Sequence, residues 1–352
     1  MKNLKIKTIK IKNKVIGENN PCYIIAEIGS NFNGDINVAK KLIKKAKEAG
    51  ADAAKFQSFQ TKKILSKKGF EKKVTFQSKW KNSVWNVYRD AELPIEWIKK
   101  LDEYAKKCKI QFLSAPYHIE AVDELVRHKI PIIKIGSGEI TNIEFLKYVA
   151  KKKLPIFLAT GASTLNDVNL AVKTIVNQKN NKIVLMQATT QYPSPIKDTN
   201  LKVIKQFRKK FNLNIGYSDH TPGYTAILGS VALGACVIEK HFTLDTESDG
   251  PDHPHSLNPK QFKEMVEKIR EMEIALGYDK KIIEESEKHT KIIQRRGIWS
   301  IKNIKKGEKF SKTNLDVLRP CVGLSASYFL KLLNKKAKKN YQAFTALKKN
   351  DL

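Results

Sequence analysis

Charged and hydroxyl-bearing side chains stand at or near the ends of most short apolar runs in this 352-residue chain. Runs of this kind are buried, and a buried charge is costly unless it has a partner. One such residue would indicate an ion pair, but their recurrence indicates a functional site. The residues concerned are Glu27, Lys55, Gln57, Ser114, Lys134, Ser137, Glu139, Thr190, Tyr192, Ser218, His220, Glu239 and His241.

Two of the seven histidines, His220 and His241, follow successive apolar runs. If those runs are neighbouring strands, the two imidazoles converge on one point. Two neutral imidazoles and a carboxylate suit a divalent transition metal. Glu27 or Glu239 would supply the carboxylate or support a histidine from behind. The alternative is a pair of hydrogen-bonded histidines without a metal.

Two strand lysines indicate an anion site. Lys55 and Lys134, with nearby serine hydroxyls, predict a dry cradle for a phosphate group. The alternative is that each lysine pairs with Glu27 or Glu139, and both descriptions can hold together. The hydroxyls belong to Ser114, Ser137 and Ser218.

A polar loop, ESDGPDHPHS, follows the last apolar run. Asp249, Asp252, His253 and His255 are further candidate metal ligands. They would serve equally as a polar rim that hydrogen bonds a hydroxylated substrate, and for Asp252 we favour a substrate contact.

Eight strand–helix units position these side chains. The apolar runs are short and nearly continuous, as in parallel strands buried on both faces, and an amphipathic helical pattern follows each. Eight such units predict an α/β fold of the (β/α)8 (TIM) barrel type, with the active site at the carboxyl ends of the strands. A doubly wound sheet is the alternative, but no GxGxxG follows the first run. The runs are 22–29, 53–59, 111–116, 132–138, 155–160, 182–189, 214–220 and 236–243.

The pattern changes after the eighth unit. We expect residues 1–278 to form the barrel domain, with an N-terminal hairpin at 1–20. Residues 279–294 are rich in charged side chains, and this pattern predicts a linker. Residues 295–352 predict a small second domain made mostly of strands and turns.

Composition narrows the class of protein. The formal net charge is +31, but lysines are spread through every predicted helix, as on solvated faces. We therefore keep a catalytically silent polyanion-binding barrel only as an alternative and do not expect a nucleic-acid partner. No run reaches the length of a membrane span. The four cysteines form no CxxC pair, which favours free thiols and the reducing cytoplasm.

Seven motifs, in order, resemble the sialic acid synthase (N-acetylneuraminate synthase) family. The tail GIWSIKNIKKGEKFSKTNLDVLRP resembles that family's C-terminal antifreeze-like (SAF) domain. The motifs are IAEIGSNFNG, ADAAKFQ, IIKIGSGE, TTQYPSP, GYSDHT, VALGACVIEKHFTLD and GPDH.

The resemblance implies condensation of phosphoenolpyruvate with an N-acetylated hexosamine such as N-acetylmannosamine. The product would be a nine-carbon 3-deoxy-2-keto acid, with release of phosphate. The resemblance also implies a divalent metal, Mn²⁺ or Mg²⁺, and a domain-swapped homodimer in which Arg319 reaches the partner's active site.

The matching positions imply a role for each residue. Glu27, Glu139 and Lys55 would be catalytic, and His220 and His241 would hold the metal, with Glu239 behind them. Substrate contacts are implied or expected for Lys55, Gln57, Ser114, Lys134, Ser137, Thr190, Tyr192, Ser218, Asp252 and Arg319.

The chain departs from the family pattern at a few positions. Ala115 and Thr190 stand where threonine and asparagine are common, and Ala159 lies in an altered LATGAST segment. Pro254-His255 replaces a common Lys-Ala, which leaves open both the N-acetylneuraminate and the N,N'-diacetyllegionaminate branch. The pseudaminic branch lacks the GPDH motif that this chain retains.

Overall fold

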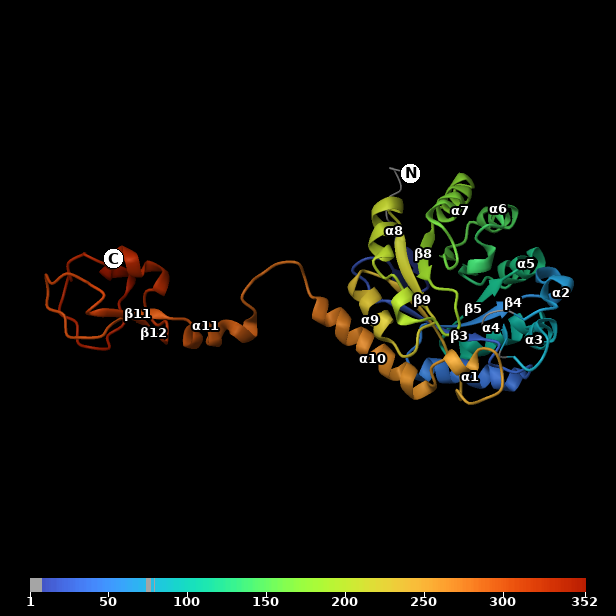
Figure 1. Ribbon diagram of the computed structural model, residues 1–352, viewed down its shortest axis with the longest axis horizontal. Helices are drawn as coiled ribbons and strands as arrows, with labels where there is room; N and C mark the ends of the chain where they lie inside the picture. Colours follow the sequence, from blue (N-terminus) through green and yellow to red (C-terminus); the bar gives the residue numbers. More distant parts are fainter. Residues whose placement is uncertain (1–7, 74–76, 79) are drawn as a thin grey trace. The chain divides into compact units, whose positions relative to one another are not determined.

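The chain folds into two compact units, each with its own buried apolar cluster. The computed structural model describes residues 8–73, 77–78 and 80–352 (Figure 1). The first unit ends at Gly277 and the second runs from Tyr278 to Leu352. Among the described residues, no helix combines the length and the apolar character that crossing a membrane requires.

Eight parallel strands form the centre of the first unit (Figure 1). Their order is β5-β4-β3-β10-β9-β8-β7-β6, and β5 also contacts β6, so the sheet curls round on itself. The prediction of a (β/α)8 barrel is therefore confirmed. The strands are β3 (Tyr23–Gly29), β4 (Ala53–Ser58), β5 (Gln111–Pro116), β6 (Ile133–Ile135), β7 (Ile156–Ala159), β8 (Ile183–Ala188), β9 (Asn214–Asp219) and β10 (Val237–His241).

A two-stranded antiparallel hairpin precedes the barrel. It pairs β1 (Ile9–Ile11) with β2 (Lys14–Ile16). Residues 1–7 of the hairpin predicted at 1–20 lie outside the described residues.

Amphipathic helices follow the strands. Each helix packs its apolar stripe against the sheet and turns its lysine-rich face to water. Side-chain caps fix where several of them begin. Thr164 and Asp167 form a reciprocal capping box at α7, as Asn258 and Gln261 do at α10. The helices are α1 (Ile36–Glu48), α2 (Thr61–Ile64), α3 (Val84–Asp90), α4 (Trp97–Lys107), α5 (Ile119–Arg127), α6 (Ile143–Lys151), α7 (Leu165–Asn177), α8 (Val203–Phe211), α9 (Thr225–Ala232) and α10 (Pro259–Leu276).

The second unit is small and contains little helix. Strand β11 (Gly297–Ser300) pairs with β12 (Leu315–Leu318) in an antiparallel arrangement, and isolated bridges extend this pairing. Its core contains Ile298, Phe310 and Leu347. The segment expected to be a linker includes the exposed helix α11 (Lys288–Gln294), and α12 (Phe329–Leu332) lies near the C-terminus.

A fully buried ion pair joins β9, which His220 follows, to β10, which ends at His241. Lys240 Nζ of β10 lies 2.7 Å from Asp219 Oδ2 of β9, and neither side chain is exposed. Successive side chains of a strand point to opposite faces, so Lys240 points away from the face that carries Glu239 and His241. Burial lowers the pKa of Lys240, while Asp219 opposes that shift. The pair therefore ties β9 to β10 directly beside the predicted active site.

Replacement of Lys240 by Met should destabilise the barrel by about 3–5 kcal/mol, because Asp219 would keep a buried charge without its partner. For a unit of this size, that corresponds to a melting temperature lowered by on the order of 10 °C. Circular dichroism during heating measures the change. Lys268→Met is the matched control, since Lys268 forms an exposed pair with Glu271, and exposed pairs contribute roughly 0–1 kcal/mol. Equal melting temperatures of the two variants would contradict the structural role of the buried pair.

Candidate active site

A cavity of about 500 Å³ opens among the loops that follow the barrel strands. It brings together side chains from β4, from the turns after β6 and β8, from β10 and from the loop that follows β10. Part of its wall is apolar. The polar lining residues include Gln57, Glu139, Tyr192, His241, Asp252 and His255, all of which the sequence marked as candidates.

Beneath Gln57 lies a compensated group of four buried charges. Lys55 Nζ lies 2.7 Å from Glu27 Oε2 and 3.7 Å from Glu239 Oε1, and Lys134 Nζ lies 2.6 Å from the same Glu239 oxygen. Gln57 Nε2 donates a 2.8 Å hydrogen bond to Glu27 and thereby connects the group to the cavity. The sequence left Glu27 and Glu139 open as lysine partners, and Lys55 does pair with Glu27, whereas Lys134 pairs with Glu239 instead. Glu139 pairs with neither lysine.

Burial and charge oppose each other in this group. Burial alone would raise the pKa of Glu239, but Lys134 and Lys55 lower it to about 2. Burial alone would lower the pKa of Lys55, but Glu239 and Glu27 raise it above its ordinary value. For Lys134 burial prevails over Glu239, and its pKa is lowered. Glu239 is thus an ionised carboxylate that pairs with both lysines inside the barrel.

The predicted hydroxyl contacts divide into two groups. Ser218 Oγ donates a 3.0 Å hydrogen bond to Glu239, which places it at the charge group. Ser137 Oγ accepts a 3.0 Å hydrogen bond from the Gly161 amide, and a Cβ built on Gly161 would lie 2.0 Å from Thr190 Oγ1. Ser137 and Thr190 therefore share one polar corner.

Ser114 lies apart from these groups. Its hydroxyl is 2.7 Å from that of Ser58 and donates a 3.2 Å hydrogen bond to the Phe56 carbonyl. It is fully buried and does not line the cavity. Its role in substrate binding stays a prediction.

Glu139 is the half-buried carboxyl group of the cavity wall. Burial raises the pKa of Glu139, and a 3.3 Å hydrogen bond from Asn142 lowers it by less. A carboxyl group with a raised pKa beside a cavity is suited to exchanging protons with a substrate.

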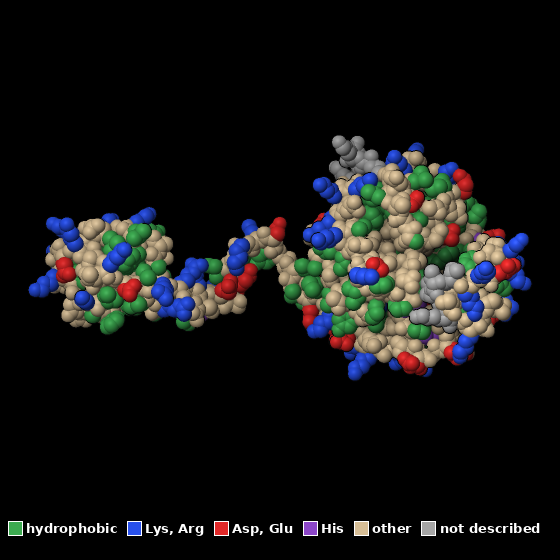
Figure 2. Space-filling view, in the orientation of Figure 1, with side chains coloured by type: hydrophobic (Ala, Val, Ile, Leu, Met, Phe, Trp, Pro, Cys, Tyr) green, Lys and Arg blue, Asp and Glu red, His purple; other side chains and the backbone are tan. Residues whose placement is uncertain are grey.

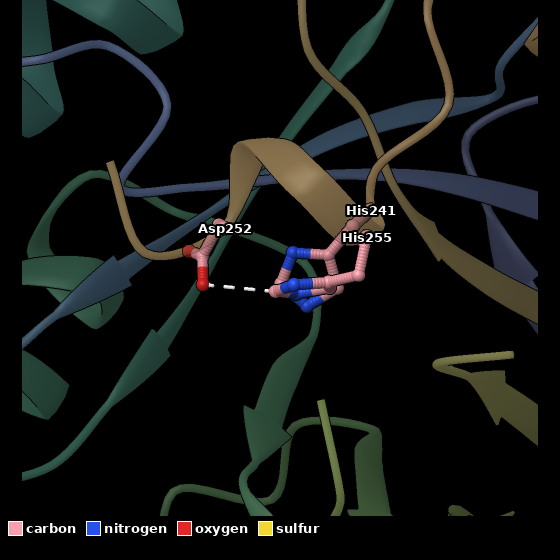
Figure 3. A group of neighbouring side chains, drawn as sticks. All are labelled: His241, Asp252 and His255. Atoms are coloured by element: carbon pink, nitrogen blue, oxygen red, sulfur yellow. Dashed lines mark ion pairs between the residues drawn. The ribbon is translucent and has the colours of Figure 1, made fainter. Parts of the chain in front are cut away.

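Three side chains at the cavity form a candidate metal centre. The ligand atoms of His241, Asp252 and His255 lie within 4.8 Å of one another (Figure 3). His241 Nδ1 and His255 Nε2 are buried and have no hydrogen-bond partner among the described residues. Burial lowers the pKa of both imidazoles, which keeps them neutral. Neutral imidazoles beside a carboxylate fit a divalent metal.

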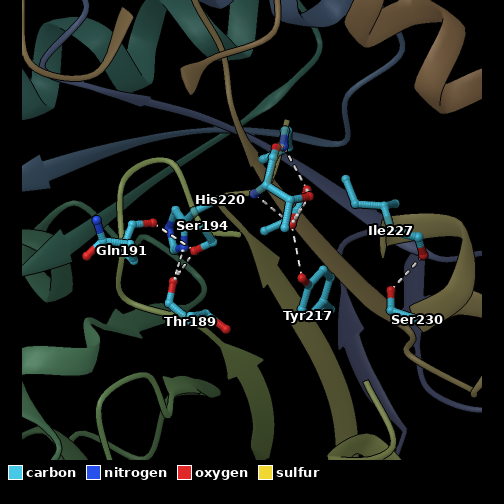
Figure 4. A network of polar contacts seen from close by, with 10 residues as sticks. Thr189, Gln191, Ser194, Tyr217, His220, Ile227 and Ser230 are labelled. Atoms are coloured by element: carbon cyan, nitrogen blue, oxygen red, sulfur yellow. Dashed lines mark hydrogen bonds and ion pairs between the residues drawn. The ribbon is translucent and has the colours of Figure 1, made fainter. Parts of the chain in front are cut away.

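His220 lies next to this centre but is not part of it. Its ring centroid is 5.5 Å from that of His241 and 4.5 Å from that of Tyr192. Its Nδ1 donates a 2.9 Å hydrogen bond to the Thr189 carbonyl (Figure 4). A backbone hydrogen bond of this kind leaves Nε2 as the basic nitrogen, as in many metal-ligating histidines. The metal-binding role of His220 stays a prediction.

The polar loop after β10 divides in the same way. Asp252 and His255 join the candidate metal centre, whereas both ring nitrogens of His253 have partners, Thr243 Oγ1 at 2.6 Å and Asn33 Oδ1 at 3.2 Å. The Asp249 side chain is fully exposed.

Glu239 contacts Lys55, Lys134 and Ser218 rather than a histidine. Its support of the metal ligands therefore stays a prediction, as do the roles of Glu27 and of Arg319, which lies in the second unit. Ser30 was not among the residues marked from the sequence, and its amide and hydroxyl both donate 3.0 Å hydrogen bonds to Asp252.

Comparison with known proteins places the chain in one family. Residues 42–281 match the model of the NeuB family and residues 295–352 match the SAF domain. The chain is 44% identical to the N,N'-diacetyllegionaminic acid synthase of Campylobacter jejuni, over 91% of this chain and 96% of that protein. It is 38% identical to the N-acetylneuraminate-9-phosphate synthase of Mus musculus, over 74% and 73% of the two chains.

A solved structure shows the same likeness. The N-acetylneuraminic acid synthetase of Leptospira borgpetersenii, crystallised with citrate, superposes with a TM-score of 0.74 at 30% identity. The likeness covers 82% of this chain and 96% of that one.

Gly29 allows Asp252 to reach its position, and Gly29→Ala should therefore destabilise the barrel more than Gly34→Ala. Both glycines have positive φ, +54° and +70°, which costs an alanine about 1–2 kcal/mol. A Cβ on Gly29 would also lie 2.4 Å from Asp252 Oδ2, whereas one on Gly34 would meet nothing within 4 Å. This overlap adds about 1–3 kcal/mol. Thermal melting compares the variants, and a Gly34 variant as unstable as the Gly29 variant would refute the close contact.

Proposed function

This chain belongs to the NeuB family, and we propose that it condenses phosphoenolpyruvate with an N-acetylated hexosamine to give a nine-carbon sialic-acid-like 3-deoxy-2-keto acid and phosphate. The observation that carries the proposal is the cavity that joins Glu139, Gln57 and His241 and connects through Gln57 to two buried lysines. A sugar and a small anion need these two environments side by side.

Lys55 and Lys134 are the proposed partners of the phosphoenolpyruvate anion. Both ammonium groups are already buried, so binding an anion costs them little further loss of water. Ser218 and the corner formed by Ser137 and Thr190 would add hydroxyl donors, which suits phosphate and carboxylate oxygens.

His220 and His241 would hold the divalent metal that the family resemblance implies. The buried, unpartnered Nδ1 of His241 and the carboxylate of Asp252 nearby fit such an ion. When bound, the metal would supply Lewis-acid polarisation of the sugar's aldehyde oxygen. Gln57, Tyr192 and Asp252 would orient the sugar in the cavity.

The proposed reaction makes one C–C bond and releases one phosphate. C3 of phosphoenolpyruvate bonds to the aldehyde carbon, and the aldehyde oxygen gains a proton. Water then adds at C2 and gives up one proton, which leaves a hydroxyl group on C2. The bond from C2 to the phosphate oxygen breaks as this hydroxyl becomes the keto group, and its proton leaves with the phosphate. In this scheme Glu139 accepts the proton from water. Glu27, which Lys55 and Gln57 hold in place, is the second candidate for proton transfer.

The cavity wall favours a deoxy, diacetamido sugar as the acceptor. Four of the apolar side chains that line the cavity would bury the methyl groups of a 6-deoxy, 4-acetamido sugar. N-Acetylmannosamine would place a hydroxymethyl group there instead. The higher identity to the legionaminic acid synthase than to the neuraminate-9-phosphate synthase supports the same choice. The side chains are Ile64, Leu65, Trp80 and Val87.

Completion of the site by a second copy of the chain is also part of the proposal. Arg319 is exposed immediately after β12, and the same unit exposes Val322, Leu330 and Phe344. An exposed guanidinium and exposed apolar side chains on one small unit suit docking on a partner's barrel, as the family resemblance implies.

A polyanion-binding barrel is the second candidate function, and it rests on the +31 net charge. Figure 2 shows Lys and Arg side chains scattered over the visible surface of each unit rather than gathered in one patch. Lys55 and Lys134 are buried and already paired with Glu27 and Glu239, so they offer a polyanion no exposed positive surface. We therefore favour the synthase.

The purified protein with Mn²⁺ and phosphoenolpyruvate should release phosphate when 2,4-diacetamido-2,4,6-trideoxymannose is present. N-Acetylmannosamine should react more slowly, because its hydroxymethyl group would face the apolar wall. Phosphate release and product mass measure both reactions. Turnover of N-acetylmannosamine alone would place the enzyme in the N-acetylneuraminate branch, and no turnover with either sugar would refute the synthase.

Glu139→Gln should lower kcat by about 10²–10⁴-fold, the usual contribution of a general base. In the wild type, kcat/KM should rise with pH through a pKa above the ordinary 4.5, because the carboxylate form accepts the proton and burial raises its pKa. The variant should lose this limb of the profile. Glu144→Gln, which changes an exposed glutamate of α6, is the control. An unchanged acidic limb in Glu139→Gln would exclude Glu139 as the base.

A further inference from the structure

The candidate metal centre contains an imidazole that the predicted histidine pair does not include. His241 ends β10, whereas Asp252 and His255 lie in the loop that follows it. Figure 3 shows the three side chains turned toward a common point. The ring centroids of His241 and His255 lie 4.6 Å apart. The ligand atoms of all three residues lie within 4.8 Å of one another.

Two ring nitrogens at this point lack partners. His241 is 5% exposed and His255 is 9% exposed, yet His241 Nδ1 and His255 Nε2 accept or donate no hydrogen bond among the described residues. A buried polar atom left unpaired costs about 1–3 kcal/mol. Two such atoms beside one carboxylate indicate a ligand that all three groups share.

The loop is anchored so that Asp252 keeps one oxygen available. Its Oδ2 accepts hydrogen bonds from the amide and hydroxyl of Ser30, each 3.0 Å long. Its Oδ1 lies 3.8 Å from His255 Nε2, which is too far for a hydrogen bond. A cation between the two atoms would satisfy both.

His253 and Ser256 fix the loop on either side of His255. Both ring nitrogens of His253 are hydrogen bonded, and Ser256 Oγ donates a 2.6 Å hydrogen bond to the Asp252 carbonyl. The imidazole of His255 is therefore held in place by its neighbours, although its own Nε2 has no protein partner.

We propose that His255 is a protein ligand of the divalent metal, together with His241 and Asp252. Two imidazoles and one carboxylate favour a transition metal such as Co²⁺, Zn²⁺ or Mn²⁺ over Mg²⁺, which prefers oxygen ligands and water. Three protein ligands leave positions open for a substrate. The inference deepens the proposed function, since the metal is the one that the synthase would use, but it concerns metal binding alone.

The hydrogen bonds that anchor the loop come from Ser30, His253 and Ser256 and none involves the His255 side chain, which makes His255→Ala a suitable variant. His255→Gln is a second variant that keeps a polar side chain of similar size.

Titration of the metal-free, full-length protein with Co²⁺ tests the proposal without phosphoenolpyruvate or sugar. Calorimetry gives the affinity, and visible absorption reports the ligands. The wild type should bind an equimolar amount of Co²⁺, and excess Mg²⁺ should not displace it. His255→Ala and His255→Gln should each bind at least about 10-fold more weakly, the loss expected even for groups that only support a ligand. Both should also show an altered cobalt spectrum. His289→Ala, which removes an exposed histidine of α11, should change neither property.

Unchanged cobalt affinity and spectrum in both His255 variants would overturn the proposal. If His220→Ala abolished cobalt binding while both His255 variants bound cobalt normally, the metal would instead lie on the predicted pair of His220 and His241. Circular dichroism and melting temperature show whether each variant is folded, and one folded His255 variant is sufficient. Because no substrate is present, weaker metal binding by these variants would support the ligand role even if the protein made no sugar acid.

Discussion

The carboxylate of Glu239 is the group on which the arrangement of the barrel mouth depends. It lies 2.6 Å from Lys134 and 3.7 Å from Lys55, and all three side chains are buried. With Glu27 it balances two positive charges with two negative charges, which makes their burial tolerable. If one carboxylate were absent, an ammonium group would remain uncompensated in the barrel, at a cost of several kcal/mol. The balance of charges is therefore a structural requirement of the barrel.

The rigid strands and the loop after β10 contribute different parts of the site. The strands fix Lys55 and Glu239 through backbone ladders on both sides and Lys134 through the ladder to β7, so their separations tolerate little adjustment. The loop contributes Asp252 and His255, whose positions depend on a few hydrogen bonds and on Gly29. His241 ends a strand and faces the loop, so it belongs to both parts. Sequence differences in the loop can therefore move Asp252 and His255 while the charge network stays intact.

The surplus of lysine acts on the surface rather than in the site. The side chains of Lys44, Lys147 and Lys268 lie on amphipathic helices, and those of Lys147 and Lys268 pair with a neighbouring carboxylate on the same helix. Such pairs contribute little to stability. Among the described residues, the strand lysines Lys55, Lys134 and Lys240 each meet a carboxylate in the dry interior. Net charge alone would have indicated a nucleic-acid partner, whereas the location of each charge favours a small-molecule enzyme.

The sequence by itself determined the barrel, because strand and helix periodicities are local properties and eight alternating units have few ways to pack. It also marked Glu27, Lys55, Lys134 and His241 as candidate site residues, because a polar or charged side chain in an apolar run is visible in the sequence alone. Which lysine pairs with which glutamate was decided only by the parallel register, which sets Glu27 beside both Lys55 and His241.

The tertiary structure also decided which hydroxyls and histidines face the cavity. Ser114 and Ser218 both stand near the end of an apolar run. Ser218 donates a hydrogen bond to Glu239, whereas the Ser114 hydroxyl is hydrogen bonded between β4 and β5. His253 and His255 lie two residues apart, yet one is fully hydrogen bonded and the other lies beside His241 and Asp252. A loop's side-chain directions depend on distant contacts such as the one between Ser30 and Asp252, and no local pattern encodes them.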